Sequence, residues 1–215
     1  MDVSVNPFKK AGIVLLVFGL IDIGLMVYCL FNGISYSSSF NVFAVIVGAF
    51  LIKGGLKTAR VVRWFSVFLA VSFVGMLLTT PFTTPVSLLL AQLKLNPIAT
   101  IGSFALGLLV ITVLAWVYLQ LSKPESLQLL AQAGYKTGRP TSAYIAGCVL
   151  LLMAVGLSTV FLNGESAQKA KALAKEQLGP DFQYHVTSLT TSGGSGHAVV
   201  TAYTDKEVRG VQVQW

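Results

Sequence analysis

The sequence predicts an α-helical polytopic membrane protein of about five transmembrane helices with a small C-terminal α+β module outside the membrane. Three observations lead to this class. Hydrophobic residues make up 54% of the 215 residues and charged residues only 11%, whereas soluble domains carry about 25% charged residues. Several apolar runs reach the roughly 20 residues that a helix needs to cross the hydrocarbon core. After residue 162 the sequence becomes polar and takes on the pattern of a compact mixed domain.

The first apolar run covers residues 11–31 and follows the pair Lys9-Lys10. Because the run exceeds the roughly 7–15 apolar residues of a signal peptide and more runs follow it, we expect an uncleaved first span. The other spans are expected at residues 36–52, 61–78, 97–121 and 142–161. The second span is the weakest by length. Together these spans define a transmembrane bundle over residues 1–162.

Residues 79–96, between the third and fourth spans, are ambiguous. Thr84-Pro85 is typical of a helix start, with Thr as the N-cap and Pro at the first helical position. The apolar stretch that follows has only about ten residues, too few to cross the membrane as a helix. We therefore expect an amphipathic helix lying in the interface, with four residues on its apolar face: Val86, Leu89, Leu90 and Leu93.

The basic residues indicate the orientation of the bundle, because loops rich in Lys and Arg stay on the cytoplasmic side. With five spans, Lys94 is alone in the short loops of one side. Nine basic residues fall on the other side: Lys9, Lys10, Lys53, Lys57, Arg60, Arg63, Lys123, Lys136 and Arg139. This asymmetry predicts a cytoplasmic N-terminus and an external C-terminus. If residues 79–96 also crossed, the C-terminus would be inside.

Residues 163–215, the C-terminal module, have balanced charge, with five basic and five acidic residues. Residues 165–178 have the composition of a helix, which Gly179-Pro180 ends. Three strands are expected at 182–190, 197–204 and 208–215, the first two joined by the Gly-rich stretch 192–196. Since about 50 residues alone are marginally stable, we expect the C-terminal module to dock on the spans, on a partner or on a second copy.

Asp22 is the one acidic residue inside a predicted span. An ionisable group at that depth is costly and is a candidate functional site by default. One interpretation is a proton or cation step, or pairing with another subunit. The alternative is a protonated or hydrogen-bonded Asp that contacts a Ser, Thr or Tyr of a neighbouring span. The sequence leaves both open.

Other residue patterns point to packing rather than to chemistry. Cys29 and Cys148 are expected in opposite leaflets, too far apart for a disulfide. His185 and His197 lie on predicted strands and make a weak pair of metal ligands without a nearby Cys. Small residues spaced by four, as in Ala44 and Gly48, mark faces for close helix packing. The sequence has no catalytic or phosphate-binding motif, and we expect no metal site and no cofactor.

These observations favour a non-enzymatic accessory, assembly or sensing subunit of a bacterial inner membrane, acting through an external C-terminal module. The alternative is a small transporter or channel that uses Asp22. The expected partners are the lipid bilayer and either another protein or a second copy of the chain. The net charge of +7 does not indicate nucleic-acid binding, because the basic residues cluster at the ends of apolar runs and are not interleaved with aromatic residues.

Overall fold

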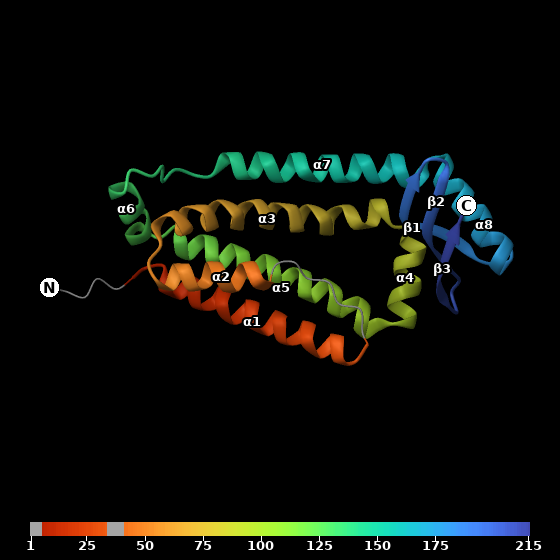
Figure 1. The fold of residues 1–215 in the computed structure, drawn as a ribbon, viewed down its shortest axis with the longest axis horizontal. Helices are drawn as coiled ribbons and strands as arrows, with labels where there is room; N and C mark the ends of the chain where they lie inside the picture. The colour runs from red at the N-terminus through yellow and green to blue at the C-terminus, as the bar shows by residue number, and fades with distance from the viewer. Residues whose placement is uncertain (1–5, 34–40) are drawn as a thin grey trace. The chain divides into compact units, whose positions relative to one another are not determined.

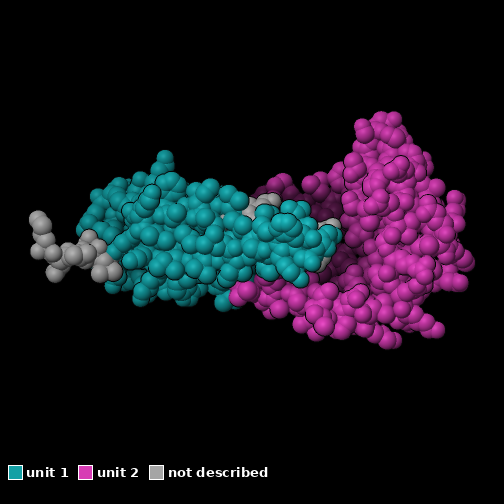
Figure 2. Space-filling model, turned by 60° about the horizontal axis from the view of Figure 1, so that its bottom comes forward, with its two compact units in different colours: residues 1–71, 110–146 teal, residues 72–109, 147–215 magenta. Residues whose placement is uncertain are grey.

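A computed structural model describes residues 6–33 and 41–215 of the chain (Figure 1). The described residues form eight helices and three strands: α1 (Lys9–Phe31), α2 (Asn41–Ile52), α3 (Leu56–Thr83), α4 (Val86–Leu95), α5 (Pro97–Leu121), α6 (Pro124–Gln132), α7 (Thr141–Asn163), α8 (Glu165–Leu178), β1 (Gln183–Ser192), β2 (Ser195–Tyr203) and β3 (Val208–Gln214). They divide into two compact units, one of residues 1–71 and 110–146 and the other of residues 72–109 and 147–215 (Figure 2). Helices α3, α5 and α7 contribute residues to both units.

Four helices of the described chain, α1, α3, α5 and α7, are long and apolar enough to cross a membrane. They correspond to the first, third, fourth and fifth predicted spans. The second predicted span is described only from Asn41, as the 12-residue helix α2. Its first part, residues 36–40, lies outside the described residues.

Helix α3 is longer than predicted at both ends. It begins at Leu56 because Gly54, with φ +81°, ends α2 and the Gly55 carbonyl accepts the Ala59 N–H at 2.9 Å. The connection between α2 and α3 therefore has only three residues, and Lys57, Arg60 and Arg63 lie on the first turns of α3. At its C-terminal end α3 continues past the predicted residue 78, through Pro81, to Thr83.

The first unit is built on a close contact between α1 and α2. Gly12 and Gly48 face each other so closely that a Cβ on either would lie 2.7 Å from the other's carbonyl oxygen. Small residues allow this approach, as the spacing of Ala44 and Gly48 predicts. The Asn6 amide closes the end of α2 by donating to the carbonyls of Leu51 and Ile52, at 3.0 and 2.9 Å.

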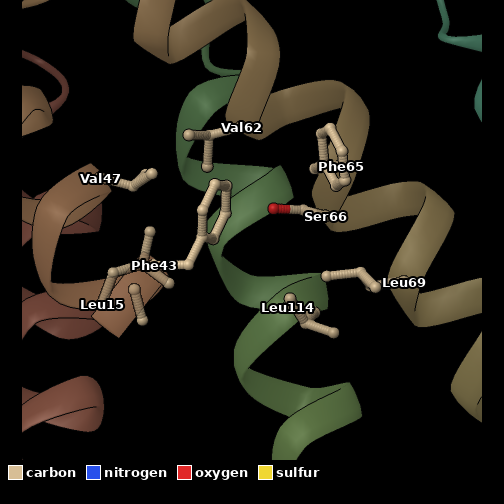
Figure 3. A pocket seen from close by; sticks show the side chains of 9 residues that line it. Leu15, Phe43, Val47, Val62, Phe65, Ser66, Leu69 and Leu114 are labelled. Atoms are coloured by element: carbon tan, nitrogen blue, oxygen red, sulfur yellow. The ribbon is translucent and has the colours of Figure 1, made fainter. Parts of the chain in front are cut away.

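Side chains from four helices meet at the centre of the first unit (Figure 3). The Phe43 ring from α2 and the Ser66 hydroxyl from α3 point into the same small space, which Leu114 of α5 closes. The space that remains is about 10 Å³, at the lower limit for one water molecule. This centre is therefore packed core and not a ligand site.

In the second unit the C-terminal module folds as predicted, with α8 before three strands. The sheet is antiparallel in the order β1-β2-β3. Three alanines of α8 (Ala167, Ala170 and Ala174) are fully buried against Val186, Ala198, Val200 and Val213 of the sheet. Because alanine side chains are short, α8 lies close to the strands, and this face of the sheet becomes the core of the C-terminal module.

Candidate functional site

The C-terminal module carries the first candidate site, a hollow at the end of the β1–β2 hairpin that we call the hairpin hollow. Its volume is about 520 Å³, and it is lined by Thr190, Ser192, Ser195, Gly196, His197, Gln214 and Trp215. The two-residue turn of Gly193 and Gly194, with φ of +56° and +90°, brings β1 and β2 together here. Only glycine adopts such angles readily.

The Trp215 indole forms one wall of the hairpin hollow. Its backbone pairs with that of Gly196 in both directions, at 2.7 and 3.0 Å, and its ring lies where a Cβ of Gly196 would be. Lys169 of α8 holds its ammonium 5.7 Å from the centre of the ring, within cation–π range. An exposed hollow with Trp, His and Gln side chains is suited to contact with another protein surface. Trp in particular is enriched among the residues that dominate binding energies at protein interfaces.

Helix α4 packs against the opposite end of the sheet. Leu88 and Ala91 of α4 are buried against Tyr203 and Val208. The Ser87 hydroxyl lies 3.0 Å from the Tyr203 hydroxyl. The C-terminal module is therefore attached to the rest of its unit by a small apolar contact and a polar one.

The apolar face predicted for α4 is not the face that packs on the sheet. Val86, Leu90 and Leu93 are 57%, 61% and 42% exposed, whereas Leu88 and Ala91 are buried. Pro85, rather than Thr84, directly precedes α4, and no side chain caps its first turn. Helix α4 is thus apolar on two sides, with one side on the sheet and the other uncovered.

A second pocket of the same unit, of about 510 Å³, lies between the ends of α3 and α7 and strand β1. Its wall carries three threonines of α3 and the adjacent Thr84, and Ser72, Ser158, His185 and Thr187 complete the polar lining. Three of the threonine hydroxyls, those of Thr79, Thr80 and Thr83, donate to carbonyls of α3 itself. The polar groups that a ligand would meet here are hydroxyls and one imidazole, and apolar side chains of α7 such as Leu151 and Val155 line much of the rest.

Burial lowers the pKa of His185 below its ordinary value of 6.5, and the positive charge of Lys171 lowers it further. The imidazole is therefore neutral at pH 7, with one nitrogen donating and the other accepting. Protonation at lower pH would place a charge in a partly buried position. His185 is thus one group of the C-terminal module through which acid would lower its stability.

Asp22 lies near the middle of α1 and is half-buried. It belongs to the first unit, whereas both histidines and the hairpin hollow belong to the second. Its helix is one of the four that are long and apolar enough to cross a membrane. Both interpretations of Asp22 remain predictions.

The structure brings five of the nine predicted orientation residues around one pocket of the first unit: Lys57, Arg60, Arg63, Lys136 and Arg139. Lys9 and Lys10 begin α1, Lys53 follows α2, and Lys123 precedes α6. These four side chains are exposed and do not line that pocket. These five residues come from two segments that are far apart in the sequence, the start of α3 and the chain that leads into α7.

The residues considered for disulfide and metal chemistry do not form such sites among the described residues. Cys29 and Cys148 are both free thiols. His185 pairs with Thr201 of β2, four residues beyond His197, so the two histidines are about 13 Å apart along the strands. The described residues contain no group of three or more His, Cys, Asp or Glu that could hold a metal ion.

Sequence reasoning missed the contacts that attach and close these sites. Asn6, Ser87 and Tyr203 are uncharged residues in ordinary surroundings, and each acts through a partner far away in the sequence. The threonine-rich stretch 79–84 was the one visible signal, because its hydroxyls are unusual beside an apolar run. Only Thr84 of that stretch enters a prediction, as the N-cap of the helix that follows.

Comparisons with models of protein families, with curated proteins and with solved structures find no match for this chain. A function must therefore be inferred from the contacts within the C-terminal module and within each of the two units.

Proposed function

We propose that the chain is an integral membrane protein that acts as a non-enzymatic accessory, assembly or sensing subunit through its C-terminal module. The membrane is proposed to be the inner membrane of a bacterium, with the N-terminus in the cytoplasm and the C-terminal module in the periplasm or outside the cell. The partner is another protein or a second copy of the chain.

The exposed surface of the long helices supports insertion into a membrane. Six large apolar side chains of α7 are more than half exposed: Ile145 (64%), Leu152 (72%), Met153 (55%), Leu157 (57%), Val160 (70%) and Phe161 (57%). Exposure of apolar area to water is unfavourable by about 25 cal/mol per Å², and contiguous exposed patches mark membrane or protein contacts. A bilayer covers such a helix on all sides. The uncovered apolar side of α4 fits the interface in the same way.

The orientation is supported by charge and by the ends of the helices. The first turns of α3 carry Lys57, Arg60 and Arg63, and the chain that leads into α7 carries Lys136 and Arg139. In the proposed orientation these residues lie on the cytoplasmic side, in agreement with the positive-inside rule. The C-terminal module begins directly after α7, and its balanced charge places no constraint on translocation.

The observation that carries the proposed function is that helices cover one face of the sheet and only one end of the other face. One face is covered by α8, and α4 covers only the Tyr203 end of the other. The hairpin hollow, with Trp215, His197 and Gln214, stays open at the opposite end. Because no other described strand pairs with the outer edges of β1 and β3, the C-terminal module offers backbone and side-chain groups to a partner.

Co-purification from the native membrane in mild detergent tests this function. We expect the full chain to retain its partner, or a second copy of itself, and the chain without residues 165–215 to lose it. A finer test replaces Gln214 in the hairpin hollow with Arg, with Gln177→Arg as the control, since both side chains are exposed but Gln177 lies on α8. The proposal predicts loss of partner for Gln214→Arg alone. If neither the deletion nor Gln214→Arg changes the partners or the phenotype, the function assigned to the C-terminal module is wrong.

A further inference from the structure

The strongest unexplained feature of the first unit is the pocket between the start of α3 and the chain that leads into α7, which we call the basic pocket. Its volume is about 700 Å³. Five of its lining residues are basic and none is acidic: Lys57, Arg60, Arg63, Lys136 and Arg139. Positive-inside orientation requires such residues to share a side of the membrane, but it does not require them to share a pocket.

Arg63 is the most informative member, because its side chain is only 7% exposed. Its Nε donates to the Ser122 hydroxyl at 2.9 Å, and its guanidinium lies 5.7 Å from the centre of the Tyr118 ring. The described residues form one salt bridge, between Arg209 and Glu207 in the C-terminal module. No described carboxylate therefore neutralises Arg63, although a buried charge without a counter-charge is unfavourable.

Neutral contacts hold the wall of the basic pocket in place. The Trp64 indole N–H donates to the Ser142 hydroxyl at 2.9 Å and so joins α3 to the first turn of α7. The Arg60 guanidinium lies 5.2 Å from the centre of the Tyr135 ring. Because these contacts use aromatic and hydroxyl groups, they position the cations without cancelling their charge.

The start of α7 adds a further positive contribution. Thr141 and Ser142 line the basic pocket and form the N-terminal end of this 23-residue helix. The N–H groups of Thr141 and Ala143 donate to the carbonyls of Arg139 and Pro140, both at 2.9 Å, and this end of the helix carries the positive end of its dipole. The basic pocket therefore combines cations, hydroxyl groups and the positive end of a helix, and this combination suits a phosphate group.

We propose that the basic pocket binds the phosphate-bearing headgroup of an anionic phospholipid. A lipid fits better than a free anion because apolar side chains, Val61, Phe65 and Leu130, also line the pocket, and Trp64 is of the type that lies at membrane interfaces. Basic pockets of this kind between helices bind lipid headgroups with more than one phosphate. With five cations and no carboxylate, a headgroup with two phosphates binds more tightly than one with a single phosphate. The inference rests on the proposed membrane insertion but not on the partner of the C-terminal module.

Lipid binding by the purified, delipidated full chain in mild detergent tests the proposal. Native mass spectrometry would compare cardiolipin, phosphatidylglycerol and phosphatidylcholine, with inorganic phosphate as a competitor. We expect cardiolipin to bind best and phosphatidylcholine worst, with no competition by phosphate at millimolar concentration. Equal binding of the three lipids overturns the site, and displacement by inorganic phosphate overturns the lipid source.

Matched charge removals separate the basic pocket from the general charge of the chain. The double variant Lys136→Gln with Arg139→Gln removes two exposed cations of the pocket. The control, Lys10→Gln with Lys123→Gln, removes two exposed cations outside it. We expect cardiolipin affinity to fall about tenfold or more in the first and to stay within about twofold in the second, since only the first removes cations that face the headgroup. Equal losses overturn the proposal. The partner test of the C-terminal module is independent of this result.

Discussion

The contact between α1 and α2 gives a stability prediction whose magnitude follows from the structure. In the variant Gly12→Ala, the new Cβ would lie 2.7 Å from the Gly48 oxygen and 2.9 Å from the Ile52 nitrogen. Both atoms belong to the backbone of α2, so a rotamer change cannot relieve the overlap and the helices must separate. Added methyl groups in packed cores cost about 1–3 kcal/mol.

Gly24→Ala is the matched control, because Gly24 lies on the same helix and no described atom outside its own stretch of helix lies within 4 Å of its Cβ position. Both variants gain the same helix propensity, about 1 kcal/mol, so their difference isolates the overlap. We expect Gly12→Ala to melt about 2–12 °C below Gly24→Ala in the same detergent, since 1 kcal/mol corresponds to about 2–4 °C for a chain of this size. Equal melting temperatures would refute the close packing of α1 on α2.

Three further predictions concern the other sites. Because burial lowers the pKa of His185, the unfolded chain binds more protons than the folded chain below about pH 6.5, so stability falls as the pH drops through that value. The variant His185→Gln should therefore weaken the decrease in melting temperature between pH 7 and 5. The control His197→Gln should preserve that decrease. If Asp22 serves a proton or cation step, Asp22→Asn should abolish ion flux into proteoliposomes, and a variant with full flux and assembly excludes that role. A Cβ at Gly196 would overlap the C-terminal indole, so Gly196→Val should lose about 1–3 kcal/mol and alter the near-ultraviolet circular dichroism, whereas Gly210→Val, with open space around it, should do neither.

The long helices were the part of the fold that the sequence predicts best. Apolar runs and their end signals give α5 and α8 with the bounds that the structure shows. The errors occur where two signals compete. Pro81 suggests a helix end, yet α3 continues past it, since a Pro near a helix terminus removes only one hydrogen bond.

The sheet was predicted in order but not in detail. The stretch 192–196 reads as one flexible loop, whereas β1 continues to Ser192, β2 starts at Ser195, and Gly193-Gly194 alone turns the chain. A register shift between Val186 and Ser188 also has no sequence signature. Polar residues such as Thr191 and Ser192 have no burial pattern, so nothing in their spacing indicates that the ladder continues through them.

The candidate sites were less predictable than the fold, because they depend on residues that come together only in three dimensions. The sequence indicates that Arg60 and Arg139 share a side of the membrane, since the positive-inside rule acts on loops. It does not indicate that they line one pocket, which depends on the packing of α3 beside the start of α7. Likewise, the pairing of Ser87 with Tyr203 follows from a helix and a strand that no local pattern connects.

The central claim is a membrane-inserted chain with its C-terminal module outside and its basic pocket inside. Cysteine labelling in intact cells tests it directly, in a chain whose native Cys29 and Cys148 are replaced by serine. With a membrane-impermeant maleimide, Ser195→Cys and Lys94→Cys should react in intact cells, and Lys136→Cys should react only after the membrane is opened. Labelling of Lys136→Cys in intact cells, with protection of Ser195→Cys until lysis, would contradict the account.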